Sequence, residues 1–449
     1  MNNFKLTPLS ELVNRVKVGF VGSINNFYCE KEKGITLIRT TDISENGIDY
    51  SNLKYVTKEF HQKNKKSQIK KGDIIIARHG ENGKANVFKE DFDAQVLNAV
   101  IIEPNQNKLE SNLLKFYFDS PFIKKQILGV VKGSVQGVIN TSHIADLLIP
   151  INPNINYKGL SKNISDLDAK IELNNKINIE LEAMAKTLYD YWFVQFDFPD
   201  ANGKPYKSSG GKMVWNVELK REIPGSWEAK KLEDLGNFKN GVNYDPSNPG
   251  EIACPIINVR NISASSYFIK NSDLDIIYLR ENDVRKYSVH KGSIIIARSG
   301  IPGATRLISD IEANTLYCGF AIHYELINLS NKLPIFFYLK SIEEMIKNGS
   351  GGTILKNVNQ ATLNNLIVAF PNNELIISKF NELVDPLFDK INLIEKENQE
   401  LASLRDWLLP MLMNGQVSVA STSSATKKGY EVEDRGLVTV SVRGVEYKK

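Results

Sequence analysis

Lys71 to Gly80 (KGDIIIARHG) and Lys291 to Gly300 (KGSIIIARSG) are ten-residue stretches that differ at only two positions. In each copy a Lys-Gly turn precedes three Ile residues, which are β-branched and too few to form a helix. The pattern predicts a buried strand that ends in an Ala-Arg pair. The chain therefore contains one design twice, and the rest of the sequence is organised around that repeat.

The two arginines that follow these strands, Arg78 and Arg298, fit two interpretations about equally well. A guanidinium at the end of a rigid strand can form a two-pronged hydrogen bond with a phosphate or with guanine. The alternative is a polar loop residue with a purely structural role. For the Ile triplets we expect only a core role.

Composition places the chain among soluble globular proteins of more than one domain. Its 449 residues suggest about three units, and 42% are hydrophobic and 24% charged. No apolar run approaches the roughly 20 residues that cross a membrane, and the N-terminus has no secretory signal pattern, so we expect a cytoplasmic protein. Cys29, Cys254 and Cys318 are scattered, and the five His residues lack HxxxH spacing. We therefore expect neither disulfides nor a metal site.

The positive charge is concentrated in the first third of the chain. The net charge is +4, and residues 1–150 contain 21 Lys and Arg against 16 Asp and Glu. Residues 225–370 contain 15 against 14, so a basic surface there would be a local patch. This distribution permits a DNA partner without requiring one.

Short apolar runs separated by polar residues predict a mostly β first unit over residues 1–150, with a few helices. The runs are Ile35–Ile38, Ile74–Ala77, Val96–Ile102 and Leu147–Ile149, and one helix is expected near Ser111–Leu128. A second unit begins at Ile223 and ends near Pro371. It repeats the parts of the first unit in the same order.

Each unit is followed by apolar residues spaced alternately four and three apart, which is typical of a coiled-coil seam. Adding the distance between the decapeptides to each seam position of the first helix gives a seam position of the second. Asn178 thereby maps onto Asn398, and we predict that both are buried and fix the helix register; the alternative is that both face solvent. Asp385-Pro386 is expected to break the second helix into two pieces.

The sequence lacks the common motifs of catalytic sites. The sequence contains no GxxxxGK[ST], GxGxxG, HExxH or GxSxG motif, and no Asn/Asp-Pro-Pro-aromatic motif for holding a flipped base. Pro199-Asp200 with Glu218 and Lys220 matches a loose nuclease pattern, but in a Pro/Gly-rich linker. After residue 416 we expect a flexible tail with at most one added strand.

Candidate DNA-binding residues occur in two similarly ordered sets. They belong to the residue types whose side chains contact phosphates and base edges in DNA grooves. In the first unit they are Arg39, Arg78, His79, Lys84, Lys132, Ser134 and Gln136; in the second they are Arg260, Arg298, Ser299, Lys356, Asn357 and Asn359.

In these repeats, and in several further stretches, the chain resembles the specificity subunit of type I restriction-modification systems. The resemblance rests on the decapeptides, the IPGSWE entry at Ile223, and the DLLIP and NLIVAFP exits. It also rests on the connector FDFPDANGKPYKSSGGKMVWN and the ending LRDWLLPMLMNGQV. It extends to about Val417, and the residues beyond depart from the family.

The resemblance implies an α+β fold with two mostly β target recognition domains, each followed by a long helix. The two helices would pair as an antiparallel coiled coil in a pseudo-two-fold tandem repeat. The expected divisions are 1–155 and 223–372 for the recognition domains, 156–198 and 373–416 for the helices, 199–222 for the connector and 417–449 for the tail.

The resemblance also implies a non-catalytic subunit that recognises a bipartite asymmetric DNA site. It would bind two methyltransferase subunits and, through them, restriction and translocase subunits. S-adenosylmethionine, ATP and Mg would be bound by those partners, with no cofactor or metal on this chain. The alternatives are a self-contained restriction or methylation enzyme and a coiled-coil adaptor that does not bind DNA.

Overall fold

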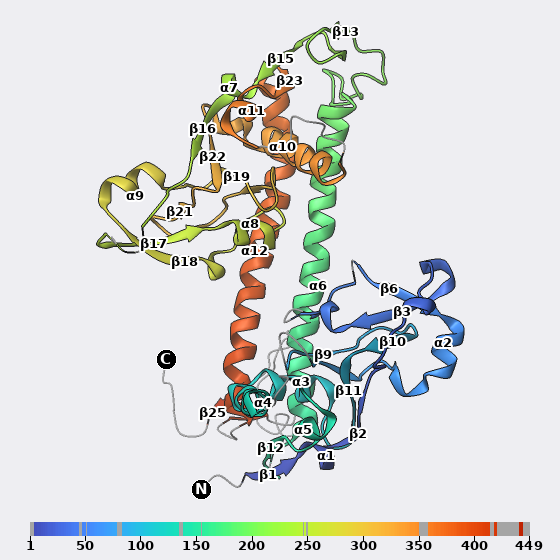
Figure 1. Cartoon of the computed structure of the whole chain (residues 1–449). Helices are drawn as coiled ribbons and strands as arrows, with labels where there is room; N and C mark the ends of the chain where they lie inside the picture. The colour runs from blue at the N-terminus through green and yellow to red at the C-terminus, as the bar shows by residue number, and fades with distance from the viewer. Residues whose placement is uncertain are drawn as a thin grey trace, which may run out of the picture. The chain divides into compact units, whose positions relative to one another are not determined.

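The structure is a computed structural model that describes residues 4–44, 47–50, 52–78, 83–133, 138–153, 155–245, 247, 250–349, 358–413, 417–419 and 440–442. These residues divide into two compact units. The first unit comprises described residues within Met1–Glu172 and Gln399–Lys449, and the second comprises those within Leu173–Asn398. Each unit therefore contains one β domain and a part of both long helices (Figure 1).

The first unit contains two four-stranded sheets, and the Ile triplet of the first decapeptide forms β8 in one of them. One has the order β2-β11-β8-β9 and the other β6-β3-β10-β7. The strands are β2 (Val13–Val18), β3 (Gly34–Arg39), β6 (Lys54–Thr57), β7 (Gln68–Ile69), β8 (Ile74–Ala77), β9 (Ala85–Val87), β10 (Ala94–Leu97) and β11 (Ala99–Pro104); β4 (Ile43–Ser44) pairs with β5 (Gly47–Ile48), and β1 (Lys5–Pro8) with β12 (Leu148–Ile151). The helices are α1 (Leu9–Leu12), α2 (Lys58–Lys63), α3 (Ser111–Asp119), α4 (Pro121–Gly133) and α5 (Thr141–Ala145).

The second unit repeats this arrangement with sheets β16-β22-β19-β20 and β18-β17-β21. Its strands are β16 (Gly236–Asn240), β17 (Ile252–Ile257), β18 (Asp275–Leu279), β19 (Ile294–Ala297), β20 (Thr305–Leu307), β21 (Leu316–Tyr317) and β22 (Ala321–Leu326); β13 (Met213–Asn216) pairs with β14 (Arg221–Pro224), and β15 (Trp227–Lys231) with β23 (Ile367–Pro371). The helices are α7 (Leu232–Leu235), α8 (Val259–Ala264), α9 (Glu281–Tyr287), α10 (Lys332–Lys347) and α11 (Gln360–Asn364).

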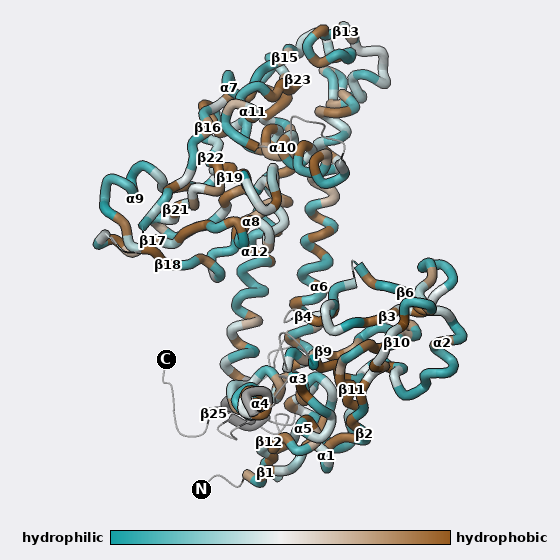
Figure 2. Tube along the Cα trace, in the orientation of Figure 1, coloured by the Kyte–Doolittle hydropathy of each residue, from teal (hydrophilic) through white to brown (hydrophobic). Residues whose placement is uncertain are grey.

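The two Ile triplets lie where the repeat predicts them. All six side chains, in β8 and β19, are at most 1% exposed. In each unit the first and third Ile pack into one hydrophobic cluster and the middle Ile into another, because successive residues of a strand face opposite sides. Figure 2 shows the hydropathy of the residues, with hydrophobic strands in each unit and hydrophilic helices α2 and α9.

One glycine in each unit joins the two sheets at the same place. Gly19 donates its N–H to the Ala99 carbonyl, and Gly241 donates to Ala321, at 2.8 and 3.1 Å. A Cβ on Gly19 would lie 2.4 Å from the Val96 carbonyl oxygen, and one on Gly241 would meet backbone oxygens at similar distances. Only glycine allows the backbones to approach this closely.

Helices α6 (Tyr157–Tyr189) and α12 (Glu374–Met413) form the antiparallel coiled coil. Within the second unit, Asn174 lies opposite Asn398 and Tyr189 lies opposite Phe380, so the two helices run in opposite directions. Asn178 and Asn398 are 6% and 8% exposed. The Asn398 side chain accepts a hydrogen bond from Asn174 and donates one to Asn175, at 2.9 and 3.0 Å, while Asn178 donates to Glu395 at 3.3 Å.

Four sequence-based expectations need correction. Helix α12 continues through Pro386, and the Asp385 carboxylate pairs with Lys332 at 2.9 Å instead of capping a new helix. The helix expected over 111–128 is two helices, because the chain is extended at Ser120, just before Pro121.

The run Val96–Ile102 is likewise two strands, interrupted at Asn98, which has a φ of 55°. Beyond the helices, β24 (Val417–Val419) pairs with β25 (Val440–Val442), so the tail has two strands rather than at most one. Among the described residues, no helix is long and apolar enough to span a membrane.

Candidate nucleic-acid interface

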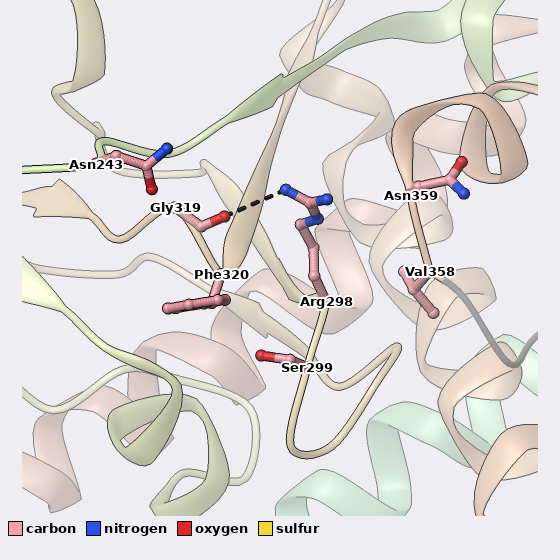
Figure 3. A pocket seen from close by; sticks show the side chains of 7 residues that line it. All are labelled: Asn243, Arg298, Ser299, Gly319, Phe320, Val358 and Asn359. Carbon is pink, nitrogen blue, oxygen red and sulfur yellow. Dashed lines mark hydrogen bonds between the residues drawn. The ribbon is translucent and has the colours of Figure 1, made fainter.

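Arg298 stands at the end of β19 and borders an open hollow of about 520 Å³ in the second unit. The strand places the residue, because the Arg298 N–H donates to the Phe320 carbonyl at 2.9 Å. Its Nη1 donates to the Gly319 carbonyl at 3.3 Å and makes a long contact of 3.5 Å with the Asn240 side-chain oxygen. Figure 3 shows one end of the guanidinium bonded to the Gly319 carbonyl and Asn359 on the opposite side of the arginine.

Apart from Arg298, the described residues that line the hollow are uncharged. Its lining residues are Asn243, Arg298, Ser299, Gly319, Phe320, Val358 and Asn359. Phe320 is 64% exposed although it is a large aromatic residue. One cation, two amides, a hydroxyl and an exposed ring form a set that can hydrogen-bond base edges and contact a base face or methyl group.

Asn359 is fixed in place by the helix that follows it. Its side-chain oxygen accepts a hydrogen bond from the Thr362 N–H at 2.9 Å, which makes it the N-cap of α11. In the first unit Asn140 precedes α5 in the same way. The two short helices therefore begin at equivalent positions beside the decapeptide arginines.

Arg78 occupies the same place in the first unit but has different hydrogen-bond partners. Its Nε donates to the Ile139 carbonyl at 2.9 Å, and its Nη2 donates to the Asn140 side chain at 3.4 Å. The Ile139 N–H in turn donates to the Arg78 carbonyl at 3.3 Å. Partial burial lowers the pKa of Arg78. This arginine thus ties the strand end to the start of α5.

Arg39 and Arg260, predicted to bind DNA as equivalent residues, are each paired with a carboxylate. Arg39 donates to Asp42 through Nε and Nη2 at 3.0 and 2.6 Å, and this hydrogen bonding raises its pKa. Arg260 pairs with Asp275 at 2.6 Å, which lowers the pKa of the Asp275 carboxyl. In each case the carboxylate offsets the arginine's charge.

The two arginines are also not equivalent in the fold. The Arg39 N–H donates to the Asp42 side chain at 2.8 Å, and in the second unit the Asn258 N–H donates to Asn261 at the same distance. The capping position of Arg39 therefore corresponds to Asn258. The two sets of candidate residues had matched Arg39 with Arg260, which lies two residues beyond Asn258.

The other predicted residues divide into those near the hollow and those the structure does not describe. Ser299 and Asn359 line the hollow with Arg298. Lys84 precedes β9, and its carbonyl accepts the Ala77 N–H at 3.0 Å. Lys132 lies in the last turn of α4, with no described side chain. His79, Ser134, Gln136, Lys356 and Asn357 lie outside the described residues.

Sequence reasoning missed Asn243 and Phe320. Neither belongs to a motif. Asn243 comes after β16 and Phe320 immediately precedes β22, and the sheet order β16-β22-β19 brings these two strands near Arg298 only after folding. A comparison of the two units gives one indication for Phe320. Its carbonyl accepts the Arg298 N–H, and the equivalent place in the first unit is the bend at Asn98. In the part of the chain that the structure describes, no cluster of three or more His, Cys, Asp or Glu side chains could hold a metal ion.

Comparison with known proteins identifies the family. The family model of the type I restriction modification DNA specificity domain matches residues 13–183 and again residues 224–403. The specificity subunit of the type I restriction enzyme MjaIX from Methanocaldococcus jannaschii is 26% identical over 362 residues, covering 78% of each chain. That of HindI from Haemophilus influenzae is 26% identical over 451 residues, covering 85% of this chain and 94% of the relative.

A solved structure has the same fold. The crystal structure of a type I restriction-modification system S subunit from M. genitalium superposes with a TM-score of 0.51 at 15% identity, covering 91% of this chain and 96% of that chain. The two matches to the family model coincide with the two repeats that the decapeptides mark. The chain therefore belongs to the type I restriction-modification DNA specificity family and is a DNA sequence-recognition subunit of such a system.

Proposed function

We propose that the chain recognises a bipartite, asymmetric DNA site, with one half bound by each β domain. The observation that supports this is the frame that both domains share, in which the decapeptide strand ends near an asparagine that precedes a short helix. The scaffold is shared, but the surrounding side chains differ between the copies. Two domains with the same scaffold but different surrounding side chains would bind two different DNA sequences.

The chain acts in this proposal as a non-catalytic subunit. The sequence lacks the motif that holds a flipped base for methylation. Two methyltransferase subunits would bind this chain, with S-adenosylmethionine bound to them, and restriction and translocase subunits with ATP and Mg would join through them. This chain would itself hold no cofactor.

Mapping methylated bases across a genome tests the proposal directly. A strain that encodes a methyltransferase partner is compared with and without this chain. We expect methylation at one split, asymmetric sequence only when the chain is present. Methylation or nicking by the purified chain alone would show an enzyme, whereas an unchanged methylation pattern with an intact complex would show an adaptor.

Domain exchange then tests the assignment of one half-site to each unit. Residues 1–155 form the exchange segment, because β1 pairs with β12 from Lys5↔Ile151 to Pro8↔Leu148 and must be moved with it. We expect a new sequence in one half of the site and no change in the other. A change in both halves would contradict separate recognition by the two domains.

A further inference from the structure

We propose that Arg298 recognises a guanine in the half-site bound by the second unit, and that Arg78 has no such role in the first. The assignment rests on the proposed function, since it requires that the second unit binds DNA in a sequence-specific manner. It names one specificity-determining contact and the class of its target, the O6 and N7 edge of guanine.

The argument begins with which edge of each guanidinium is occupied. In Arg298 the Nη1 group is held by the Gly319 carbonyl, and the Nε and Nη2 groups have no hydrogen-bond partner among the described residues. Nε and Nη2 share one edge of the guanidinium plane, so this edge presents two parallel N–H donors. Two parallel donors match the paired O6 and N7 acceptors of guanine.

In Arg78 the same edge is already used within the protein. Its Nε donates to the Ile139 carbonyl and its Nη2 to Asn140. To reach guanine, Arg78 would have to break both hydrogen bonds and release the start of α5. The nearly identical decapeptides thus place a recognition group in one unit and a structural group in the other.

The lining of the hollow favours a base over a phosphate. Arg298 is the only cation among the described lining residues, and the rest are amide, hydroxyl, aromatic and aliphatic groups. Phosphate contacts gain most of their free energy from charge, and the described lining residues supply no second positive charge beside Arg298. Phe320, exposed beside Arg298, offers an apolar surface to the same or the next base.

The Arg298 backbone is held in position before DNA binds. Its N–H donates to Phe320, and the turn that follows is closed by hydrogen bonds of 2.9 Å from Gly303 to the Ala297 carbonyl and from Ala297 to the Ala304 carbonyl. Gly300 in this turn has a φ of 74°, which favours glycine. Less conformational freedom is lost on binding when the group is held beforehand.

The test uses the full chain in complex with its methyltransferase subunits and duplexes that contain the mapped site. Each G·C pair in the second unit's half-site is replaced in turn, and 7-deazaguanine is placed at each guanine to remove N7. For the wild type we expect one guanine whose replacement weakens binding roughly 5- to 150-fold. R298A should bind more weakly and lose its preference at that pair alone.

Two further variants separate the possible causes. R298K keeps the charge but not the paired donors, so it should also lose the preference while keeping the salt dependence of binding. R78A is the matched control, and it should leave every base preference in both half-sites unchanged. Thermal melting of each complex establishes that the variants are folded.

Several outcomes would overturn the assignment. They are a half-site without guanine, an R298A complex that keeps all its base preferences, or a loss in R78A equal to that in R298A. A uniform loss in R298A, with a salt slope lower by about one and recovery in R298K, would show a phosphate contact instead. In all these cases the wild type still binds a specific sequence; a wild type without sequence preference would instead refute the proposed function.

Discussion

Replacing Glu343 by Gln is expected to destabilise the second unit by about 3–5 kcal/mol, because the change leaves buried cations without a counter-charge. Glu343 is 1% exposed and accepts hydrogen bonds from Arg306 and Lys340 at 3.0 and 2.8 Å, from Lys347 at 2.7 Å and from the Thr305 N–H at 3.0 Å. Arg306 itself is 3% exposed. Gln keeps the shape of the side chain, so the variant isolates the loss of charge.

The assay is thermal and urea unfolding of the full chain. For a unit of this size the expected loss corresponds to a fall in Tm of roughly 6–20 °C. Lys347→Gln is the matched control, since the Lys347 side chain is 59% exposed and its loss should cost less than about 1 kcal/mol. The double variant Arg306→Met/Glu343→Leu removes both charges and should lose less than the sum of the single changes.

The pH dependence of unfolding provides a second measurement on the same residue. Burial raises the pKa of Glu343, but the charges of Lys340 and Arg306 outweigh it and lower the pKa to about 2. A depressed pKa gives stability that is present above the ordinary carboxyl pKa of roughly 4.3 and is lost as the pH falls toward 2. The wild type should lose its advantage over Glu343→Gln across this interval. A constant difference, or a loss below about 1 kcal/mol at neutral pH, would refute the reasoning.

Two further predictions concern the sheets and the coiled coil. Gly19→Ala should destabilise the first unit by about 1–3 kcal/mol, because the new Cβ would lie 2.4 Å from the Val96 carbonyl oxygen. Gly129→Ala in α4 has nothing within 4 Å and should stabilise slightly; equal urea midpoints for the two variants would contradict this. Asn174→Leu/Asn398→Leu should raise the thermal stability of the helix pair and allow other registers, measured by disulfide crosslinking between engineered cysteines; a single crosslinked register would show that the asparagines do not set it.

The repeat allowed much of the fold to be predicted, because strand and seam positions depend on local residue patterns. A triplet of β-branched residues between a Lys-Gly turn and a polar loop has few alternatives to a buried strand, and both triplets form one. The spacing of apolar residues likewise predicted two long helices. Two of the four incorrect expectations fall where one residue decides the local backbone, at Ser120 and Asn98. The other two are the break expected at Asp385-Pro386 and the number of strands in the tail.

The candidate site was predictable only in part. Arg298, Ser299 and Asn359 were predicted from the sequence and lie around one hollow, whereas Asn243 and Phe320 were not predicted. These last two residues come from separate loops that meet only because β22 lies beside both β16 and β19. No local pattern records that pairing.

The sequence by itself determined that the chain repeats one α+β design, that each copy ends a buried strand with an arginine, and that a long helix follows each copy. Only the tertiary structure decided what each arginine does. The Arg78 side chain donates hydrogen bonds to Ile139 and Asn140. The Arg298 side chain donates one to Gly319 and keeps the Nε and Nη2 edge of its guanidinium for the hollow. A strand position follows from burial of neighbouring side chains, but the partner of a long polar side chain is selected among residues distant in sequence, by hydrogen bonds worth about 1 kcal/mol each.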